Sequence, residues 1–386
     1  MSRFFDLVSK PARNMATAKS SSPTTAELER RENLIRLDSN ESPFGPSARV
    51  QDAMRRSLST SNKYPDDDCN ELRLKLAADH QLLPEQVLVT AGSTALLGLL
   101  CQTLLAPGLN AVTSECSFVV YAMAVQAAGA SLIEAPMREH GFDLDAILAT
   151  IDANTRIVFL ANPNNPTGTV LEAEMVQRFL ERLPSHVVLL LDEAYYEFAT
   201  HFAKLRKMNY SNALDYVRGG LSVVVLRTFS KAHGLAGLRI GYGLGPAELL
   251  GYCARMRNTF SVSSVAQAAA LASLEDHEQV SLVVESNAIQ SRDLAQGLYE
   301  LGYKTVPTSA NFLFCDVGED AAGFAKRMQD EGVAVRPLGQ WGAPSCIRVT
   351  IGKPEQNRAF LQAVRRIKSS DRAAEPQASS TIRSVV

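Results

Sequence analysis

Short apolar runs separated by helical patterns are the feature that most limits how this chain of 386 residues can fold. The clearest runs are Val87–Thr90, Asn110–Thr113, Arg156–Leu160, Val187–Leu191 and Ser222–Leu226. A strand that is apolar throughout has to be covered on both faces, and the segments between these runs have helical patterns. The sequence therefore predicts an α/β fold whose mainly parallel central sheet is sandwiched by helices.

The pattern changes after about residue 270. A long helical stretch at 282–301 is followed by short strands near 311–315, 333–336 and 346–351, with helices at 321–331 and 354–367. This mixture predicts a smaller α+β domain beside the large one. The expected organisation is a flexible N-terminal tail (1–32), an N-terminal arm contributing to the small domain (33–60), a large domain (61–268), a small C-terminal domain (269–368) and a flexible C-terminal tail (369–386).

Composition excludes several classes of function. The formal net charge of −2 gives no basic face for nucleic acid. No apolar run approaches the ~20 residues needed to cross a membrane. The six cysteines and six histidines are scattered singly, so no metal site is expected and the thiols fit a reduced, cytoplasmic protein.

Polar residues at the ends of the expected strands carry the chemical signal, because ligands of open α/β sheets bind at the carboxyl ends of the strands. Gly92-Ser93-Thr94 follows the first strand, where a glycine and a helix N-terminus suit a phosphate group. An ordinary capped turn is the alternative for this segment. Asn165 lies in a turn with two prolines, rigid enough to hold its amide still as a donor to a phenolate oxygen.

Asp192 directly follows a fully apolar strand and needs a cationic partner there. A protonated pyridine nitrogen would be one, and a helix N-cap is the alternative. Tyr195, three residues on, could donate to the same ring. Lys231 follows another strand among hydroxyls and glycines, where a partly desolvated amine can form a Schiff base. A solvated surface lysine is the alternative.

These segments resemble the fold-type I aminotransferases that depend on pyridoxal 5′-phosphate, and most closely the histidinol-phosphate aminotransferase branch. The resemblance covers nearly all of residues 33–367. It is carried by the stretches 37–47, 64–66, 162–168, 192–195 and 228–242, and the spacing from Lys231 to Arg239 matches the family.

The resemblance implies a role for each site residue. Lys231 forms the Schiff base and moves the proton, Asp192 pairs with the pyridine nitrogen, and Asn165 and Tyr195 hold the ring hydroxyl. The implied phosphate ligands are Gly92, Ser93, Thr94, Thr228, Ser230 and Arg239. Phe118 takes the place of the ring that stacks on the cofactor, although a core phenylalanine is a competing interpretation.

The resemblance further implies a homodimer, in which Tyr64 reaches the phosphate of the neighbouring subunit. Arg348 matches the arginine that binds a substrate carboxylate or phosphate, and Arg336 and Asn40 are further substrate-binding candidates.

The implied function is transfer of an amino group from an amino acid or amine to a 2-oxo acid such as 2-oxoglutarate, with histidinol phosphate as the first donor. Two departures leave the donor open: the family's Pro-Tyr stretch is missing before Leu37, and Thr94-Ala95 stands where Asp or Asn and then Glu are common. Aromatic amino-acid transamination, amino-acid decarboxylation or oxidation on the same scaffold, and a non-catalytic cofactor-binding regulator remain as alternatives.

Overall fold

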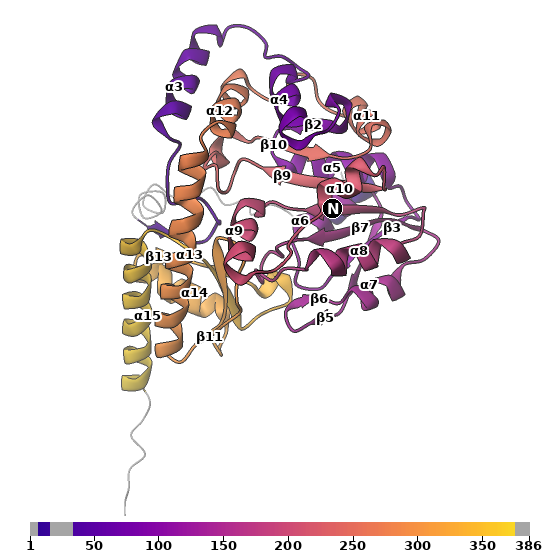
Figure 1. Ribbon diagram of the computed structural model, residues 1–386. Coiled ribbons are helices and arrows are strands. Elements are labelled where there is room, and N and C mark those ends of the chain that lie inside the picture. The colour runs from indigo at the N-terminus through magenta and orange to yellow at the C-terminus, as the bar shows by residue number, and fades with distance from the viewer. Residues whose placement is uncertain (1–6, 16–33, 375–386) are drawn as a thin grey trace, which may run out of the picture.

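The computed structural model describes residues 7–15 and 34–374, which form a large layered unit beside a smaller one (Figure 1). The large unit contains a seven-stranded sheet of order β2-β10-β9-β8-β7-β3-β4. Its strands are β2 (Val87–Thr90), β3 (Asn110–Ser114), β4 (Ser131–Ala135), β7 (Thr155–Ala161), β8 (Val188–Asp192), β9 (Val223–Thr228) and β10 (Gly241–Leu244).

The prediction of a mainly parallel sheet is confirmed. The strands from β4 through β3, β7 and β8 to β9 are paired in parallel, whereas β10 runs antiparallel to both β9 and β2. We did not predict β10 as a strand, since its sequence Gly-Tyr-Gly-Leu lacks the apolar run of the others. Six strands therefore share one direction, and their carboxyl ends meet along one edge.

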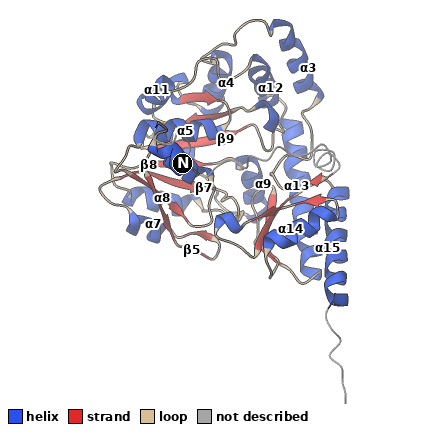
Figure 2. Ribbon diagram, turned by 180° about the vertical axis from the view of Figure 1, so that it is seen from behind, coloured by secondary structure: helices blue, strands red, loops and turns tan. Residues whose placement is uncertain are grey.

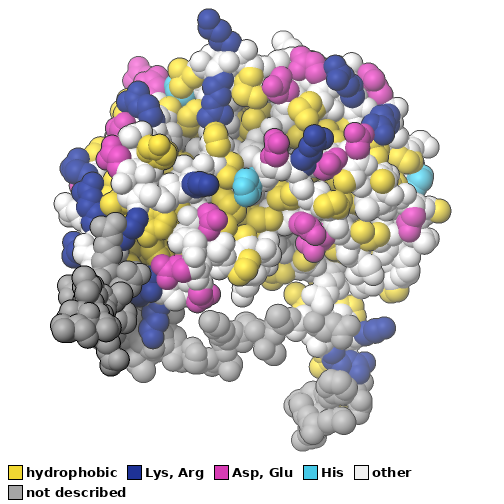
Figure 3. Space-filling view, turned by 90° about the horizontal axis from the view of Figure 1, so that it is seen from below, with side chains coloured by type: hydrophobic (Ala, Val, Ile, Leu, Met, Phe, Trp, Pro, Cys, Tyr) yellow, Lys and Arg dark blue, Asp and Glu magenta, His cyan; other side chains and the backbone are white. Residues whose placement is uncertain are grey.

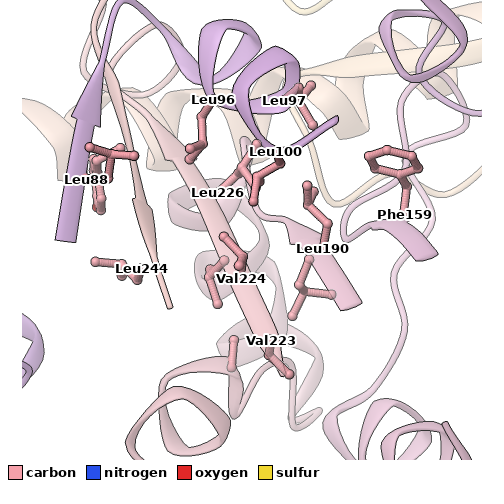
Figure 4. Close-up of a cluster of buried hydrophobic side chains, with 14 of the residues drawn as sticks. Leu88, Leu96, Leu97, Leu100, Phe159, Leu190, Val223, Val224, Leu226 and Leu244 are labelled. Carbon is pink, nitrogen blue, oxygen red and sulfur yellow. The ribbon is translucent and has the colours of Figure 1, made fainter. Parts of the chain in front are cut away.

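Helices flank the large sheet (Figures 1 and 2). They are α4 (Asn70–His80), α5 (Ser93–Leu104), α6 (Val120–Ala127), α7 (Leu144–Thr150), α8 (Ala173–Arg182), α9 (Tyr196–Arg206), α10 (Ala213–Arg218) and α11 (Ala247–Arg255), with short 3₁₀ turns at Pro84–Gln86 and Ala236–Leu238. Leu96 and Leu100 of α5 pack toward Leu226 of β9 in the main hydrophobic core (Figure 4). The core extends under the whole sheet and holds the strand ends in place.

The small unit is built on a four-stranded sheet of order β11-β12-β15-β14. It comprises β11 (Lys304–Thr305), β12 (Phe312–Asp316), β14 (Arg336–Pro337) and β15 (Cys346–Thr350), with α13 (His277–Glu300), α14 (Ala321–Asp330), α15 (Pro354–Ala374) and a 3₁₀ turn at Gly339–Trp341. The single strand expected at 333–336 is two: β13 (Val333–Ala334) pairs with β1 (Ile35–Arg36), whereas β14 pairs with β15.

The N-terminal arm reaches both units. Its β1 pairs in parallel with β13, while α3 (Ala48–Ser57) packs along α12 (Ser264–Leu274). A 3₁₀ turn at Leu58–Thr60 and a hairpin of β5 (Met137–Arg138) with β6 (Gly141–Phe142) complete the elements. Within the expected tails, the structure describes a short helix α1 (Lys10–Asn14) and the last turns of α15; the remainder of both tails lies outside the described residues.

Charges of both signs are interspersed on the face seen from below (Figure 3). Within the described part of the chain, no helix is long and apolar enough to cross a membrane. The same residues hold no cluster of three or more potential metal-ligating side chains.

A buried ion pair links the strand carrying Asp192 to β9. Arg227 donates through Nε and Nη2 to Glu193 Oε2, at 3.0 and 2.7 Å, and its guanidinium lies 3.5 Å from the centre of the Tyr196 ring. Both charged side chains are almost completely buried. Removing one partner would leave the other charge buried without a counterion.

We therefore expect Arg227→Met to lower the free energy of unfolding by about 3–5 kcal/mol. Urea denaturation is the measurement. Arg49→Met, which breaks the exposed pair with Glu275, is the control and should cost less than about 1 kcal/mol. Equal effects from the two variants would show that burial does not set the energy of this pair.

Candidate active site

One cavity of about 580 Å³ opens where the carboxyl ends of the strands meet the small unit. Most residues singled out from the sequence line it. They are Asn40, Ser93, Thr94, Phe118, Asn165, Asp192, Tyr195, Thr228, Ser230, Lys231, Arg239, Arg336 and Arg348. Segments distant in sequence are thus brought to one place, as the strand-end argument predicts.

Lys231 follows β9 and presents its amine to the cavity. Nζ donates to the backbone carbonyls of Asn40, at 3.0 Å, and Ser39, at 3.4 Å. Burial is the main cause that lowers the pKa of Lys231 to about 7, and the positive charges of Arg348 and Arg239 lower it further. A large fraction of this amine is therefore uncharged near neutral pH, which a nucleophile requires.

Asp192 is the last residue of β8 and is 5% exposed. Its Oδ2 accepts from the Tyr121 hydroxyl at 2.9 Å, and its Oδ1 accepts from the backbone N–H of Ala194 at 3.1 Å. Burial raises the pKa of Asp192 to about 6, against the lowering effect of these two donors. Within the described residues, no lysine or arginine forms an ion pair with it, so the carboxylate is available to a cationic ligand.

The amide of Asn165 is oriented by Arg348. Arg348 Nη1 donates to Asn165 Oδ1 at 2.6 Å, so the amide oxygen faces the arginine and the NH₂ group is left to donate elsewhere. Arg348 Nη2 donates to the Asp38 carbonyl at 2.9 Å, while its buried Nε has no hydrogen-bond partner in the part of the chain that the structure describes. Burial lowers the pKa of Arg348 to about 10.

Arg336 stands opposite Arg348 in the β14–β15 pair. Its Nε donates to the same Asp38 carbonyl at 3.2 Å, and its Nη2 lies 3.5 Å from the Asp38 carboxylate. The two arginines therefore share one anchor and both line the cavity. Two neighbouring cations, one of which has no carboxylate partner within the described residues, favour an anionic ligand.

The start of α5 forms the anion-binding side of the cavity. Gly92, its N-cap, has φ +82°, and a Cβ there would lie 2.6 Å from Arg239 Nη2. Gly92 thus lets the Arg239 guanidinium approach the helix N-terminus rather than lining the cavity itself. Ser93, Thr94, Thr228 and Ser230 line the same side, and the Thr228 hydroxyl donates to Ser230 Oγ at 3.0 Å. Hydroxyls, an arginine and free helix N–H groups together suit a phosphate.

Two aromatic candidates and Asn40 complete the lining. Asn40 Nδ2 donates to the Tyr195 hydroxyl at 2.8 Å, which fixes the position of that oxygen. Phe118 is half-buried at the cavity wall and meets Tyr121 edge-on, with ring centres 5.6 Å apart. Tyr64 does not line this cavity: it is 81% exposed and stacks on Phe260.

Several site residues were not recognised in the sequence. Tyr121 contacts Asp192 from behind the cavity, Asp38 holds both substrate-side arginines, and Trp341 lines the cavity from the small unit. Only Tyr121 had a usable signal, because it lies three residues after Phe118, and the two rings are in contact in the structure.

The comparisons with known proteins agree with this geometry. Residues 32–364 match the family model of aminotransferase class I and II. A histidinol-phosphate aminotransferase 2 of Pseudomonas fluorescens strain Pf0-1 is 42% identical over 334 residues, covering 86% of this chain and 89% of that protein. The corresponding relative in Pseudomonas aeruginosa is 41% identical over 338 residues, covering 88% of this chain and 90% of that protein.

Solved structures show the same fold. A histidinol-phosphate aminotransferase from Sinorhizobium meliloti, in complex with pyridoxal-5′-phosphate, superposes with a TM-score of 0.81 at 29% identity, covering 90% of this chain and 96% of that one. Aspartate aminotransferase from Thermus thermophilus with maleate reaches the same TM-score at 26% identity, covering 93% and 99%. This chain therefore belongs to the class I and II aminotransferases, with the fold-type I architecture and a close relationship to the histidinol-phosphate aminotransferases.

Proposed function

We propose that this aminotransferase holds pyridoxal 5′-phosphate in the 580 Å³ cavity and moves an amino group from a donor amine to a 2-oxo acid. Histidinol phosphate is the first donor to test and 2-oxoglutarate the first acceptor. One observation carries the proposal: a lysine amine, a buried carboxylate and an oriented amide, from three separate strand ends, line one cavity.

The residues present fit this cofactor in charge and shape. The buried Asp192 carboxylate forms no ion pair with a lysine or arginine of the described chain, which suits a pyridinium nitrogen. The close approach of Arg239 to Gly92 and the start of α5 suits a phosphate dianion. The NH₂ group of Asn165 and the hydroxyl of Tyr195 can both serve the ring hydroxyl.

When bound, pyridoxal phosphate supplies an aldehyde carbon that reacts with amines and a ring that withdraws electrons from the bonds of that amine. Lys231 would supply the amine that captures the cofactor and would act as the general base that takes the proton from the substrate Cα. Asp192 would keep a proton on the ring nitrogen. Thr228, Ser230 and Arg239 would hold the phosphate, and Phe118 would pack against the ring.

The substrate side of the cavity is positively charged and favours an anionic ligand. The Arg348 guanidinium lines the cavity and forms no ion pair with a carboxylate of the described residues, and a guanidinium suits a carboxylate or a phosphate. Arg336, next to it on β14, can take a second anionic group. A donor with one or two acidic groups is therefore favoured over a purely cationic amine.

A donor screen tests the proposal directly. Purified protein loaded with pyridoxal phosphate should convert the bound cofactor to its amino form when given histidinol phosphate without an acceptor. Adding 2-oxoglutarate should restore the starting absorbance. The screen should include histidine, aromatic amino acids and glutamate, with carbon dioxide release and oxygen consumption monitored. A protein that takes up no cofactor would contradict the proposal.

The pKa of Lys231 makes the capture of the cofactor depend on pH. Below pH 7 the amine is mostly charged and cannot attack, so the capture rate of the apoprotein should rise about tenfold per pH unit and level off above pH 7. Arg348→Leu removes a positive charge that lowers this pKa, so the inflection should move to higher pH. Stopped-flow absorbance measures the rate, with Arg336→Leu as the matched control. An inflection that moves equally in both variants would contradict the role of Arg348.

We also propose a homodimer in which Tyr64 reaches the phosphate of the neighbouring site. Its exposed stack on Phe260, away from its own cavity, supports this arrangement. Analytical ultracentrifugation is the test, since a monomer at micromolar concentration would contradict the proposal. Tyr64→Phe should weaken cofactor binding in the dimer without changing the association of the subunits.

A further inference from the structure

A buried tyrosine outside the cavity touches the carboxylate inside it. Tyr121, in α6, is 0% exposed and does not line the cavity. Its hydroxyl donates to Asp192 Oδ2 at 2.9 Å, although the two residues are 71 positions apart in the chain. A phenol in this position has a single proton, and the structure directs it at Asp192.

Asp192 depends on few donors. Among the described residues, each oxygen has one hydrogen-bond donor, Tyr121 Oη on Oδ2 and Ala194 N on Oδ1. Two donors on different oxygens fix the plane of the carboxylate, whereas the backbone N–H alone would let it rotate. The other charged or titratable groups acting on Asp192 are Lys231, which favours its charge, and Glu193 and Tyr195, which do not.

The ring of Tyr121 has no freedom of its own. It stacks parallel on Phe159, with ring centres 4.6 Å apart and an angle of 8°, in the apolar core beneath the sheet. It also meets Phe118 edge-on at the cavity wall, with ring centres 5.6 Å apart and an angle of 89°. The same side chain therefore positions both the carboxylate and the aromatic ring that face the ligand.

We propose that Tyr121 is a positioning residue of the reaction, which holds the Asp192 carboxylate in the orientation that meets the cofactor's ring nitrogen. The inference rests on the proposed function, because Asp192 acts only toward a bound ring. Tyr121 touches neither cofactor nor substrate and acts through Asp192. Because Tyr121 contacts Phe118 as well as Asp192, it also fixes the position of the Phe118 ring relative to the carboxylate.

The ionisation of the two groups supports the geometry. Burial raises the pKa of Tyr121 far above its ordinary value, so the hydroxyl remains a donor at every working pH. Burial also raises the pKa of Asp192 to about 6, and the hydrogen bond from Tyr121 is the largest effect opposing that rise. Without the hydroxyl the pKa of Asp192 would move closer to neutrality, and less of the carboxylate would be charged at pH 7.

Tyr121→Phe is the direct test, because it removes the hydroxyl and keeps the ring that packs on Phe159 and Phe118. Trp341 is the only tryptophan of the chain and lines the cavity, so quenching of its fluorescence reports binding to the apoprotein. Two probes are titrated: pyridoxal phosphate, and its carbocyclic analogue in which C–H replaces the ring nitrogen. The analogue fills the same space and cannot pair with Asp192.

We expect Tyr121→Phe to weaken binding of pyridoxal phosphate about tenfold or more and to change binding of the analogue less than about twofold. Tyr216→Phe is the matched control: it removes another buried hydroxyl, bonded to the Ala173 carbonyl at 3.3 Å and remote from the cavity. This control should leave both dissociation constants unchanged. A merely structural role of Tyr121 would weaken binding of both probes alike, so it would leave the ratio of their dissociation constants unchanged.

Each outcome decides a different point. Equal weakening of both probes, or no weakening of either, would overturn the role of Tyr121. A wild-type protein that binds neither probe would instead overturn the proposed function.

Tyr121→His is the second variant, for use if Tyr121→Phe fails to fold. It supplies an aromatic side chain with an N–H for Asp192. In Tyr121→His, the ratio of the dissociation constant of the analogue to that of pyridoxal phosphate should stay within about threefold of the wild-type ratio. A folded Tyr121→His variant whose ratio falls to about one would contradict the proposal.

Discussion

Lys231→Ala should lower kcat for transamination by on the order of 10⁴-fold or more. Among the residues lining the cavity, Lys231 is the only one with an amine side chain. Its loss removes both the nucleophile that captures the cofactor and the base that takes the Cα proton. The phosphate ligands remain, so the variant should still bind pyridoxal phosphate without a covalent link.

Covalent labelling of the lysine, measured beside kcat, separates these effects. Borohydride reduction followed by peptide mass analysis should label the Lys231 peptide in wild type and leave the variant unlabelled. Lys204→Ala, on the exposed surface of α9, is the control and should retain full activity. A Lys231→Ala variant with more than a few per cent of wild-type kcat would mean that another group carries the proton.

Asp192→Asn should lower kcat by about 10²–10³-fold, the range seen when a preorganised electrostatic contact is removed from an active site. The substitution keeps the size of the side chain but removes its negative charge, so a proton on the ring nitrogen is no longer stabilised. A smaller fall in cofactor affinity should accompany it. Turnover at saturating donor and acceptor, together with Trp341 quenching, measures the two effects.

Asp215→Asn serves as the control, because that carboxylate pairs with Arg218 at the exposed surface. It should change neither quantity. Cofactor bearing a permanent positive charge on the ring, through N-methylation, offers a complementary probe, provided that it still enters the cavity. An Asp192→Asn variant with wild-type turnover would remove the carboxylate from the mechanism.

Much of the sheet and most of the site could be predicted. Continuous apolar runs such as Val187–Leu191 show their strands directly, and a polar residue after each run is placed at a shared edge by the parallel pairing. Strand β10 was not predicted because it contains glycines at 241 and 243 in place of apolar side chains. Close packing requires these glycines, since a Cβ at Gly241 would lie 2.6 Å from the Ser93 backbone nitrogen. Such a requirement comes from a neighbouring segment and has no local pattern.

The same distinction applies within the site. The role of Gly92 as a phosphate ligand stays a prediction, but the sequence did not indicate that a Cβ at this position would lie 2.6 Å from Arg239 Nη2. The direction of the Asn165 amide depends on Arg348, 183 residues away, and the hydrogen bond to Asp192 comes from a tyrosine in helix α6. Residue types at strand ends indicate the available chemistry, but the partners of each group depend on how distant segments pack.

By itself the sequence determined which chemical groups this protein can bring to a cofactor and the strand ends that carry them, because side-chain chemistry and strand periodicity are local properties. Only the tertiary structure decided the protonation and the orientation of these groups. The pKa of about 7 at Lys231 and the carboxylate of Asp192 held by Tyr121 depend on desolvation and on contacts between remote segments. The first requires burial of the amine and the nearby charge of Arg348 from the small unit, and the second requires α6 to pack beside the end of β8.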